Sequence, residues 1–260
     1  MEKKAIFFDV DGTLVSFKTH RVSVENREIL KELRAKGHKV FIATGRMQNM
    51  LDDVLEGIEF DGYISYNGAL CTDSTKESTI FKSVIPKEQL EALAERLKVD
   101  KFPVSFMGKH NMYVNYIDDK VKKVAEMVCL DLPLVKPVEE IIKEDIYQLC
   151  IYLDSERLDK VIAEVLPNCE YSRWIDVFAD VNVKGLSKDT GIEKMLEHFN
   201  ISLSNTMAFG DGGNDIPMLK YVAVGVAMGN AADHVKAAAN YVTTSVDDNG
   251  IVNAVRHFNL

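Results

Sequence analysis

The sequence predicts an α/β protein: a Rossmann-like core with a parallel sheet, interrupted by an inserted α+β unit. In the first third of the chain, short apolar segments alternate with helical segments, and the same alternation returns in the last third. Such alternation implies parallel strands joined by right-handed crossovers. The middle of the chain follows a different pattern. We therefore expect a discontinuous core of residues 1–82 and 184–260, and an inserted cap of residues 83–183.

The first part of the core is expected to contain three buried strands, because three runs of apolar residues are each followed by polar residues or glycine. Ser23 is suited to cap the start of the first helix, and Gly37 to end it. The expected elements, in order, are a strand over Ala5–Phe8, a helix between Ser23 and Gly37, a strand over Val40–Ala43, a helix over Met47–Glu56 and a strand over Tyr63–Ser65.

The second part of the core repeats this alternation after the inserted unit. The expected elements are a helix over Lys188–Phe199, a strand over Thr206–Phe209, a strand over Val222–Ala227, a helix over Ala231–Ala239, a short strand over Tyr241–Thr243 and a closing helix over Ile251–Phe258. The strand at Thr206–Phe209 is followed by a loop rich in glycine and aspartate. Together with the first part, these segments predict one sheet with polar residues at the strand ends.

The inserted unit begins with Pro86 in the first turn of a helix, followed by Leu90, Leu93 and Leu97 on one helical face. Further elements are expected as strands over Val104–Met107 and Met112–Asn115, a helix over Asp118–Cys129, a strand over Tyr147–Leu153, a helix over Glu156–Leu166, and strands over Glu170–Ile175 and Val177–Asp180. Strands and helices of this kind predict an independent α+β unit.

Composition limits the partners and the compartment. The net charge of −9 argues against nucleic acid or an anionic membrane as a partner. No apolar run is long enough to span a bilayer, and the N-terminal apolar run is too short for a signal peptide. The four cysteines are far apart, which argues against zinc and favours reduced thiols in the cytoplasm. Because the net charge is negative, binding a phosphate ligand would need a metal ion and basic side chains placed at the site.

Asp9 and Asp11 follow the first strand directly. Ligands of open α/β sheets bind at the carboxyl ends of the strands. Two acids two positions apart in extended chain point to the same side, roughly 7 Å apart. This geometry suits one divalent metal ion and one phosphate group. The alternative is a pair of ordinary turn residues that cap a helix or loop.

Thr44, Gly45 and Arg46 follow the second strand. A hydroxyl group and free backbone N–H groups at the start of a helix form an anion site, and Arg46 adds a cation. We expect this segment to bind a phosphate group. The alternative is an N-cap threonine beside a surface arginine.

Lys188 lies at the expected start of the first helix after the insertion, where its ammonium group could hold both the Asp9 carboxylate and a phosphate. Lys184 is the competing candidate, because it directly precedes a glycine. The apolar face formed by Ile192, Met195 and Leu196 behind the helix start favours Lys188.

Asp211, Asn214 and Asp215 lie in a glycine-rich loop after the strand at Thr206–Phe209. Mg²⁺ prefers an octahedral shell of oxygen ligands and usually keeps several waters. We expect a Mg²⁺ site formed by Asp9, Asp11, Asp211 and Asp215, with Asp215 acting directly or through a water. Asn214 would orient Lys188 or reach the phosphate. The alternative is an ordinary turn; a dinucleotide loop is excluded because the glycine spacing is wrong.

These four segments resemble the motifs of the haloacid dehalogenase-like phosphohydrolases, in the family's order. Asp9 to Thr13 match DxDxT, Thr44 matches the second motif, Lys188 the third, and Gly210 to Asp215 match GDxxND. The third motif departs from the family pattern, since Lys188 is not followed directly by glycine. Asn67-Gly68-Ala69 resembles the Cof-type subfamily, which carries a large cap between the second and third motifs.

The resemblance implies a Mg²⁺-dependent phosphatase for small phosphate monoesters, with hexose and pentose phosphates as first candidates. Asp9 would attack phosphorus to form an aspartyl-phosphate, and Asp11 would act as general acid and base. Two alternatives stay open: a phosphomutase that transfers the phosphoryl group between sugar hydroxyls, and a non-catalytic phospholigand-binding protein. Specificity is expected in the cap, and the sequence does not indicate the oligomeric state.

Overall fold

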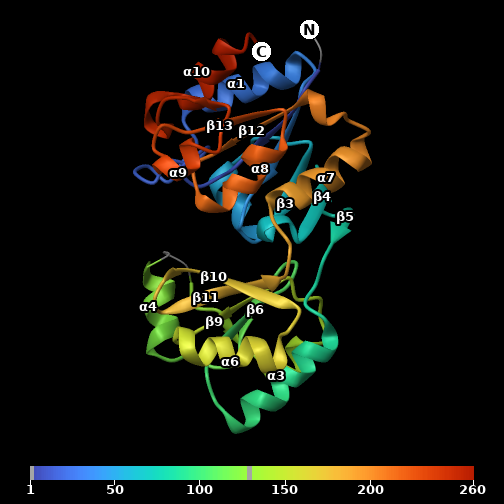
Figure 1. Cartoon of the computed structure of the whole chain (residues 1–260), viewed down its shortest axis with the longest axis vertical. Helices are drawn as coiled ribbons and strands as arrows, with labels where there is room; N and C mark the ends of the chain where they lie inside the picture. Colours follow the sequence, from blue (N-terminus) through green and yellow to red (C-terminus); the bar gives the residue numbers. More distant parts are fainter. Residues whose placement is uncertain (1–2, 128–130) are drawn as a thin grey trace. The chain divides into compact units, whose positions relative to one another are not determined.

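The computed structural model describes residues 3–127 and 131–260 and divides into two compact units (Figure 1). The core unit comprises Met1–Lys82 and Leu186–Leu260, and the inserted unit comprises Ser83–Gly185. The second boundary falls two residues later than expected. Backbone hydrogen bonds explain the difference, because Lys184 donates to the carbonyl of Asn168 and Gly185 donates to the Glu170 carboxylate.

The core unit is built on an eight-stranded sheet in which the first six strands along the sheet are parallel. Two antiparallel strands, which the sequence pattern did not predict, extend it at one edge. In spatial order the strands are β14 (Tyr241–Val242), β13 (Val224–Ala227), β12 (Thr206–Gly210), β1 (Ala5–Phe8), β2 (Lys39–Ala43), β3 (Gly62–Ser65), β4 (Leu70–Asp73) and β5 (Thr79–Lys82). The α/β fold class predicted from the sequence is confirmed.

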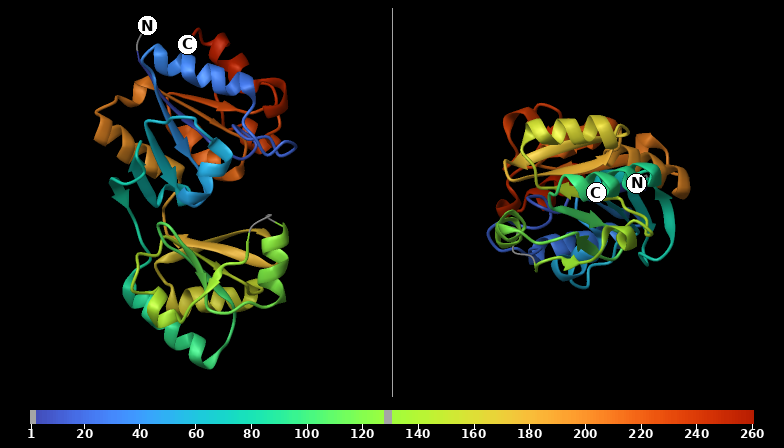
Figure 2. Two further views of the ribbon diagram at one scale, coloured as in Figure 1. Left: turned by 180° about the vertical axis from the view of Figure 1, so that it is seen from behind. Right: turned by 90° about the horizontal axis from the view of Figure 1, so that it is seen from below.

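Helices cover both faces of this sheet. The helices α1 (Val24–Ala35) and α10 (Gly250–His257) pack on one face, and α7 (Lys188–Phe199) and α8 (Ile216–Tyr221) on the other (Figures 1 and 2). Side chains of β1 alternate between the two cores: Ile6 and Phe8 join the α1 side, and Ala5 and Phe7 join the α7 side. Because all four are fully buried, β1 is the central strand that fixes the position of the residues after it.

Several short elements of the core unit differ from the expected ones. The helix expected over Met47–Glu56 is a 3₁₀ turn, η1 (Gln48–Leu51), followed by α2 (Asp52–Leu55). Only α9 (Asp233–Lys236) forms within 231–239, and β13 begins at Val224 because Val222 still ends α8 by donating to Met218. The remaining 3₁₀ turns are η2 (Tyr66–Gly68), η3 (Leu203–Asn205), η4 (Gly213–Asp215) and η5 (Val246–Asp248).

The inserted unit contains its own six-stranded, mostly antiparallel sheet. Its strands, in spatial order, are β10 (Cys169–Ile175), β11 (Phe178–Val183), β9 (Gln148–Ile151), β6 (Val104–Met107), β7 (Met112–Val114) and β8 (Leu134–Val135). The helices α3 (Lys87–Val99), α5 (Val138–Ile141) and α6 (Ser155–Val165) contribute to the main core, and α4 (Asp119–Met127) packs in a second cluster. Cys129, the expected end of α4, lies outside the described residues.

No helix within residues 3–127 and 131–260 is long and apolar enough to cross a membrane. In the same part of the chain, Cys71, Cys150 and Cys169 are buried free thiols. Burial raises the pKa of the Cys71 thiol to about 12, so this cysteine is held in its neutral form.

Candidate active site

The predicted site residues lie at one edge of the core sheet. Asp9 follows β1, Thr44 follows β2, and Asp211 follows β12. These three strands are parallel neighbours in the order β12–β1–β2, so their carboxyl ends meet at the same edge. The fold therefore brings the loops after β1 and β2 together with the loop after β12, which lies more than a hundred residues further along the sequence.

Lys188, the first residue of α7, connects two of the carboxylates. Its Nζ lies 2.5 Å from Oδ1 of Asp9 and 2.6 Å from Oδ1 of Asp215, and the lysine is fully buried. Burial alone would lower its pKa, but the charges of Asp215 and Asp9 raise it above the ordinary value, which keeps the ammonium charged. Lys184 instead donates to the carbonyl of Pro167 in the inserted unit, so the structure places Lys188 between these acids.

Asp9, Asp211 and Asp215 form a group of carboxylates that each offer an oxygen within 4.8 Å of the others. Burial, with the neighbouring Asp215, raises the pKa of Asp9 well above its ordinary value, although Lys188 opposes this shift. Burial also raises the pKa of Asp211 to about 6. Three acids around one lysine leave excess negative charge, and their oxygen atoms are ligands that Mg²⁺ prefers. The residues present therefore fit a magnesium ion.

Asp215 has a second role in this group, because it closes the loop that carries Asp211. Its Oδ2 accepts the backbone N–H groups of Asp211 at 2.9 Å and Gly212 at 2.8 Å. Both of its oxygens therefore have protein donors. A side chain at Gly210 would meet the Asp215 Cβ at 2.5 Å, so the loop requires glycine at that position.

The Asp11 carboxylate is not part of this group. The Arg46 guanidinium donates to both of its oxygens, with Nε 2.7 Å from Oδ2 and Nη2 2.6 Å from Oδ1. Hydrogen bonding to Asp11 raises the pKa of Arg46. In this structure, the cation that we predicted for phosphate binding therefore pairs with Asp11. Metal binding by Asp11 and phosphate binding by Arg46 stay predictions.

The Thr44 loop meets the Asn214 loop through a residue that the sequence analysis did not place in the site. The buried Thr44 hydroxyl accepts the backbone N–H of Arg46 at 3.0 Å. Asn214 donates from Nδ2 to Oδ1 of Asn67 at 3.0 Å, and the Asn67 carboxamide lies close over Gly45. The predicted role of Asn214 in orienting Lys188 is not seen as a hydrogen bond here.

Thr13 and Asn230 were also missed, and both hold Asp211. The Thr13 hydroxyl donates to Oδ1 of Asp211 at 2.9 Å, and Asn230 Nδ2 donates to Oδ2 at 3.1 Å. Asn230 also donates to the carbonyl of Gly12 at 2.9 Å. Thr13 belongs to the first motif, and Asn230 closely follows the strand β13, so a search for polar residues after each strand would have found both.

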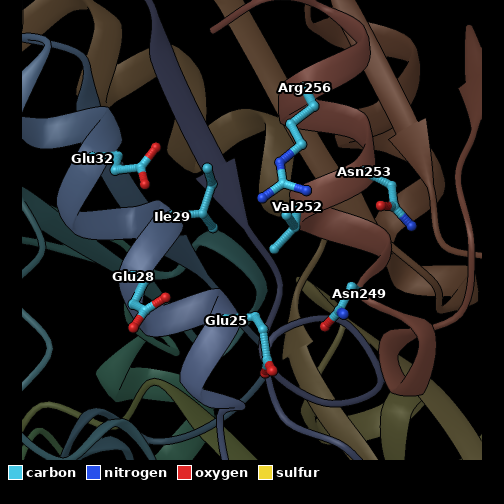
Figure 3. A pocket seen from close by; sticks show the side chains of 8 residues that line it. All are labelled: Glu25, Glu28, Ile29, Glu32, Asn249, Val252, Asn253 and Arg256. Carbon is cyan, nitrogen blue, oxygen red and sulfur yellow. The ribbon is translucent and has the colours of Figure 1, made fainter.

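A separate pocket of about 180 Å³ lies between α1 and α10 and contains none of the predicted site residues (Figure 3). The α1 wall carries three glutamates, and the α10 wall carries polar and basic side chains. These residues are Glu25, Glu28, Glu32, Asn249, Asn253 and Arg256. The candidate active site is therefore defined by its buried charged side chains rather than by this pocket.

A parallel sheet that carries an aspartate pair after one strand, an acidic loop after its neighbour and a buried lysine between them defines a haloacid dehalogenase-like hydrolase. The family profile matches residues 6–255, and the chain belongs to this family. Its relatives and structural neighbours include several proteins named as phosphatases, and the protein is a phosphatase of this superfamily.

Three similar proteins illustrate the relationship. YkrA of Bacillus subtilis (strain 168), which is named as a candidate phosphatase, is 34% identical over 263 residues, covering 100% of this chain and 99% of its own. The solved structure of the subclass IIB sugar phosphatase BT4131 is 42% identical with a TM-score of 0.81, covering 99% of both chains. BT1666 from Bacteroides thetaiotaomicron is 38% identical with a TM-score of 0.88, covering 99% of this chain and 95% of its own.

Proposed function

We propose that this phosphatase hydrolyses phosphate monoesters of sugars through a covalent phosphoryl group on Asp9, with Mg²⁺ as cofactor. The observation that carries the proposal is the fully buried Lys188, which pairs with both Asp9 and Asp215. A lysine held in this way fixes one oxygen of Asp9 and leaves Oδ2 as the attacking atom. Clustering three carboxylates around one lysine costs stability, and a catalytic role would offset that cost.

The reaction takes place in two steps. Asp9 Oδ2 attacks phosphorus and the bond from phosphorus to the ester oxygen breaks. Asp11 acts in its protonated form, with one oxygen released from the Arg46 guanidinium and the other still held by it, and gives its proton to the departing oxygen. Asp11 then accepts a proton from a water molecule, whose oxygen attacks phosphorus. The bond between phosphorus and Asp9 breaks, and inorganic phosphate leaves. Lys188 stabilises negative charge at Asp9 in both steps.

Asp9 and Asp211 are the residues that would hold Mg²⁺, supported by Asp215. Asp215 Oδ1 faces the Lys188 ammonium and Oδ2 accepts two backbone N–H groups, whereas each oxygen of Asp211 has a single neutral donor. The contribution of Asp215 is therefore to position the Asp211 loop or to act through a water. When bound, Mg²⁺ would neutralise charge on the acids and on the phosphate. Thr13 and Asn230 hold the Asp211 carboxylate from either side, which fixes its orientation.

The substrate proposal is a sugar phosphate, supported by the likeness to the sugar phosphatase BT4131. We also propose that the inserted unit supplies specificity. One face of its sheet carries hydrogen-bonded polar side chains: Gln148 donates to Asp180, and Asn182 donates to Gln148. Groups of this kind can hydrogen-bond to the hydroxyls of a sugar. The comparisons do not favour the phosphomutase alternative.

The test is phosphate release from a panel of sugar phosphates by wild type and Asp9→Asn, with Mg²⁺ and with a chelator. We expect release by wild type only when Mg²⁺ is present, and none by Asp9→Asn. Circular dichroism and thermal unfolding provide the control that the variant is folded. Wild-type turnover by a folded Asp9→Asn protein would disprove the nucleophile assignment.

A further inference from the structure

The short turn η2, which contains Asn67, has a strained backbone at the edge of the candidate site. Tyr66 and Asn67 both have φ of 52°, and Gly68 has φ of 104°. Non-glycine residues rarely adopt such left-handed conformations, and each one costs about 1 kcal/mol or more. Two of them in succession persist only because the surrounding structure holds them.

The contacts that hold η2 come from other loops of the site. The backbone N–H of Asn67 donates to the carbonyl of Thr44 at 3.0 Å, and that of Tyr66 to Arg46 at 3.3 Å. On its other side, Gly68 packs against the residue before Lys188, where an added Cβ would lie 2.2 Å from the Ser187 carbonyl oxygen. The turn is therefore fixed between the Thr44 loop and the start of α7.

This placement gives the Asn67 side chain a defined position. An added Cβ at Gly45 would lie 3.2 Å from both Nδ2 and Oδ1 of Asn67, so the carboxamide lies flat over that glycine. Its Oδ1 accepts from Asn214 Nδ2. Asn67 Nδ2 has no hydrogen-bond partner within residues 3–127 and 131–260. An oriented amide donor is thus left between the two loops for which we predicted phosphate contacts.

We propose that Asn67 binds the phosphoryl group of the substrate, with Nδ2 donating a hydrogen bond to a phosphate oxygen. This inference rests on the proposed function. A phosphate dianion that enters a site with several carboxylates needs donors that face it, and a neutral amide supplies one without altering the charge balance of the acids. Hydrogen bonds from a fixed donor to a charged acceptor are among the stronger ones in proteins.

The test compares Asn67→Gly and Asn67→Ala with wild type. Glycine adopts the left-handed conformation freely, so Asn67→Gly keeps the turn and removes only the carboxamide. Two readouts are needed: kcat/KM for several esters with different leaving groups, and binding of inorganic phosphate by calorimetry. We expect kcat/KM of Asn67→Gly to fall by about 10- to 100-fold, and by the same factor for every ester. We also expect this variant to bind inorganic phosphate more weakly.

Three results would overturn the inference. Asn67→Gly with wild-type kinetics would show that only the backbone turn matters, and a loss confined to some esters would assign Asn67 to the leaving group. The third result is that adding Asn67→Gly to an Asn214→Ala protein causes no further loss of kcat/KM. This result would mean that Asn67 only orients Asn214. If wild type itself releases no phosphate, the proposed function fails, whereas the binding of inorganic phosphate still tests Asn67.

Discussion

The guanidinium of Arg46 pairs with both carboxylate oxygens of Asp11, at 2.6 and 2.7 Å. The pair is about one-third exposed, so it lies at the edge of the buried group rather than within it. A bidentate pair of this kind fixes the plane of the carboxylate. Asp11 is therefore oriented by a residue from the neighbouring strand's loop, independently of the group formed by Asp9, Asp211 and Asp215.

This pairing predicts that Arg46→Ala impairs the protonation of the leaving group. The variant should lose about 10- to 100-fold in kcat/KM for a sugar phosphate, because a misoriented general acid loses part of its contribution. The loss should be much smaller for p-nitrophenyl phosphate, whose leaving group needs no proton. Equal losses for both esters would instead assign Arg46 to phosphate binding. Arg46→Lys is the matched control that keeps the charge without the bidentate geometry.

Removal of the buried ammonium should destabilise the protein. Lys188→Met leaves Asp9 and Asp215 as neighbouring buried acids without a cation between them, which lowers the free energy of unfolding by about 3–5 kcal/mol. Urea unfolding in the presence of a chelator measures this change in the free energy of unfolding. Lys184→Met is the matched control, since its ammonium donates to the carbonyl of Pro167 and not to a buried acid, and we expect a change in the free energy of unfolding within about 0.5 kcal/mol. Equal stability of the two variants would contradict the assigned role of Lys188.

The raised pKa of Asp211 predicts a pH-dependent response to Mg²⁺. Its pKa in the folded protein is about 6, against 3.8 for the free side chain. The folded state therefore holds the proton more tightly, and metal-free stability falls as the pH rises from about 4 to about 6. Mg²⁺ needs the ionised carboxylate, so the increase in Tm on adding Mg²⁺ should grow over the same range, and the raised pKa of Asp9 extends this growth to higher pH. An increase that is independent of pH, or that survives in Asp211→Asn, would contradict this site.

The close contact between η2 and α7 predicts a large cost for Gly68→Ala. The added methyl would lie 2.2 Å from the carbonyl oxygen of Ser187, at a φ of +104°. Gly57→Ala provides a control with only the conformational cost, because its φ is +67° and no atom lies within 4 Å of the added Cβ. We expect the free energy of unfolding to fall by about 1 kcal/mol in Gly57→Ala and by at least about twice that in Gly68→Ala, measured by thermal or urea unfolding. Similar losses would show that α7 can move away without penalty.

The sequence predicted the elements whose signals are local. The run Ala5–Phe8 is fully buried on both faces and reads as continuous apolar sequence, so both the strand β1 and the position of Asp9 at its end were predictable. The strands β4 and β5 were not, because their pairing depends on a hairpin against β3 rather than on a strong apolar pattern. The helices expected over Met47–Glu56 and Ala231–Ala239 were predicted too long. The residues beside α2 and α9 form three-residue hydrogen-bonded turns, which the apolar pattern does not distinguish from α-helix.

The site was predictable to the extent that its residues follow strands. Asp9, Thr44 and Asp211 each come directly after a buried strand or within one residue of its end. The pairing of Arg46 with Asp11 was not predictable, since it joins the ends of two different strands. Asn67 was missed for the same reason: its partner Asn214 lies 147 residues away and meets it only in the folded protein. Asn230, by contrast, lies three residues after β13 and could have been found by its position.

In the proposed mechanism, Asp9 carries the phosphoryl group during turnover. The direct measurement is acid quenching of the enzyme during steady-state hydrolysis of a sugar phosphate, followed by proteolysis and mass spectrometry. We predict that the peptide containing Asp9 gains the mass of one phosphoryl group, and that Asp9→Asn shows no such gain. Phosphate release at the full rate with the phosphoryl group on a residue other than Asp9 would contradict this mechanism. Turnover that is retained in Asp9→Asn would contradict it as well.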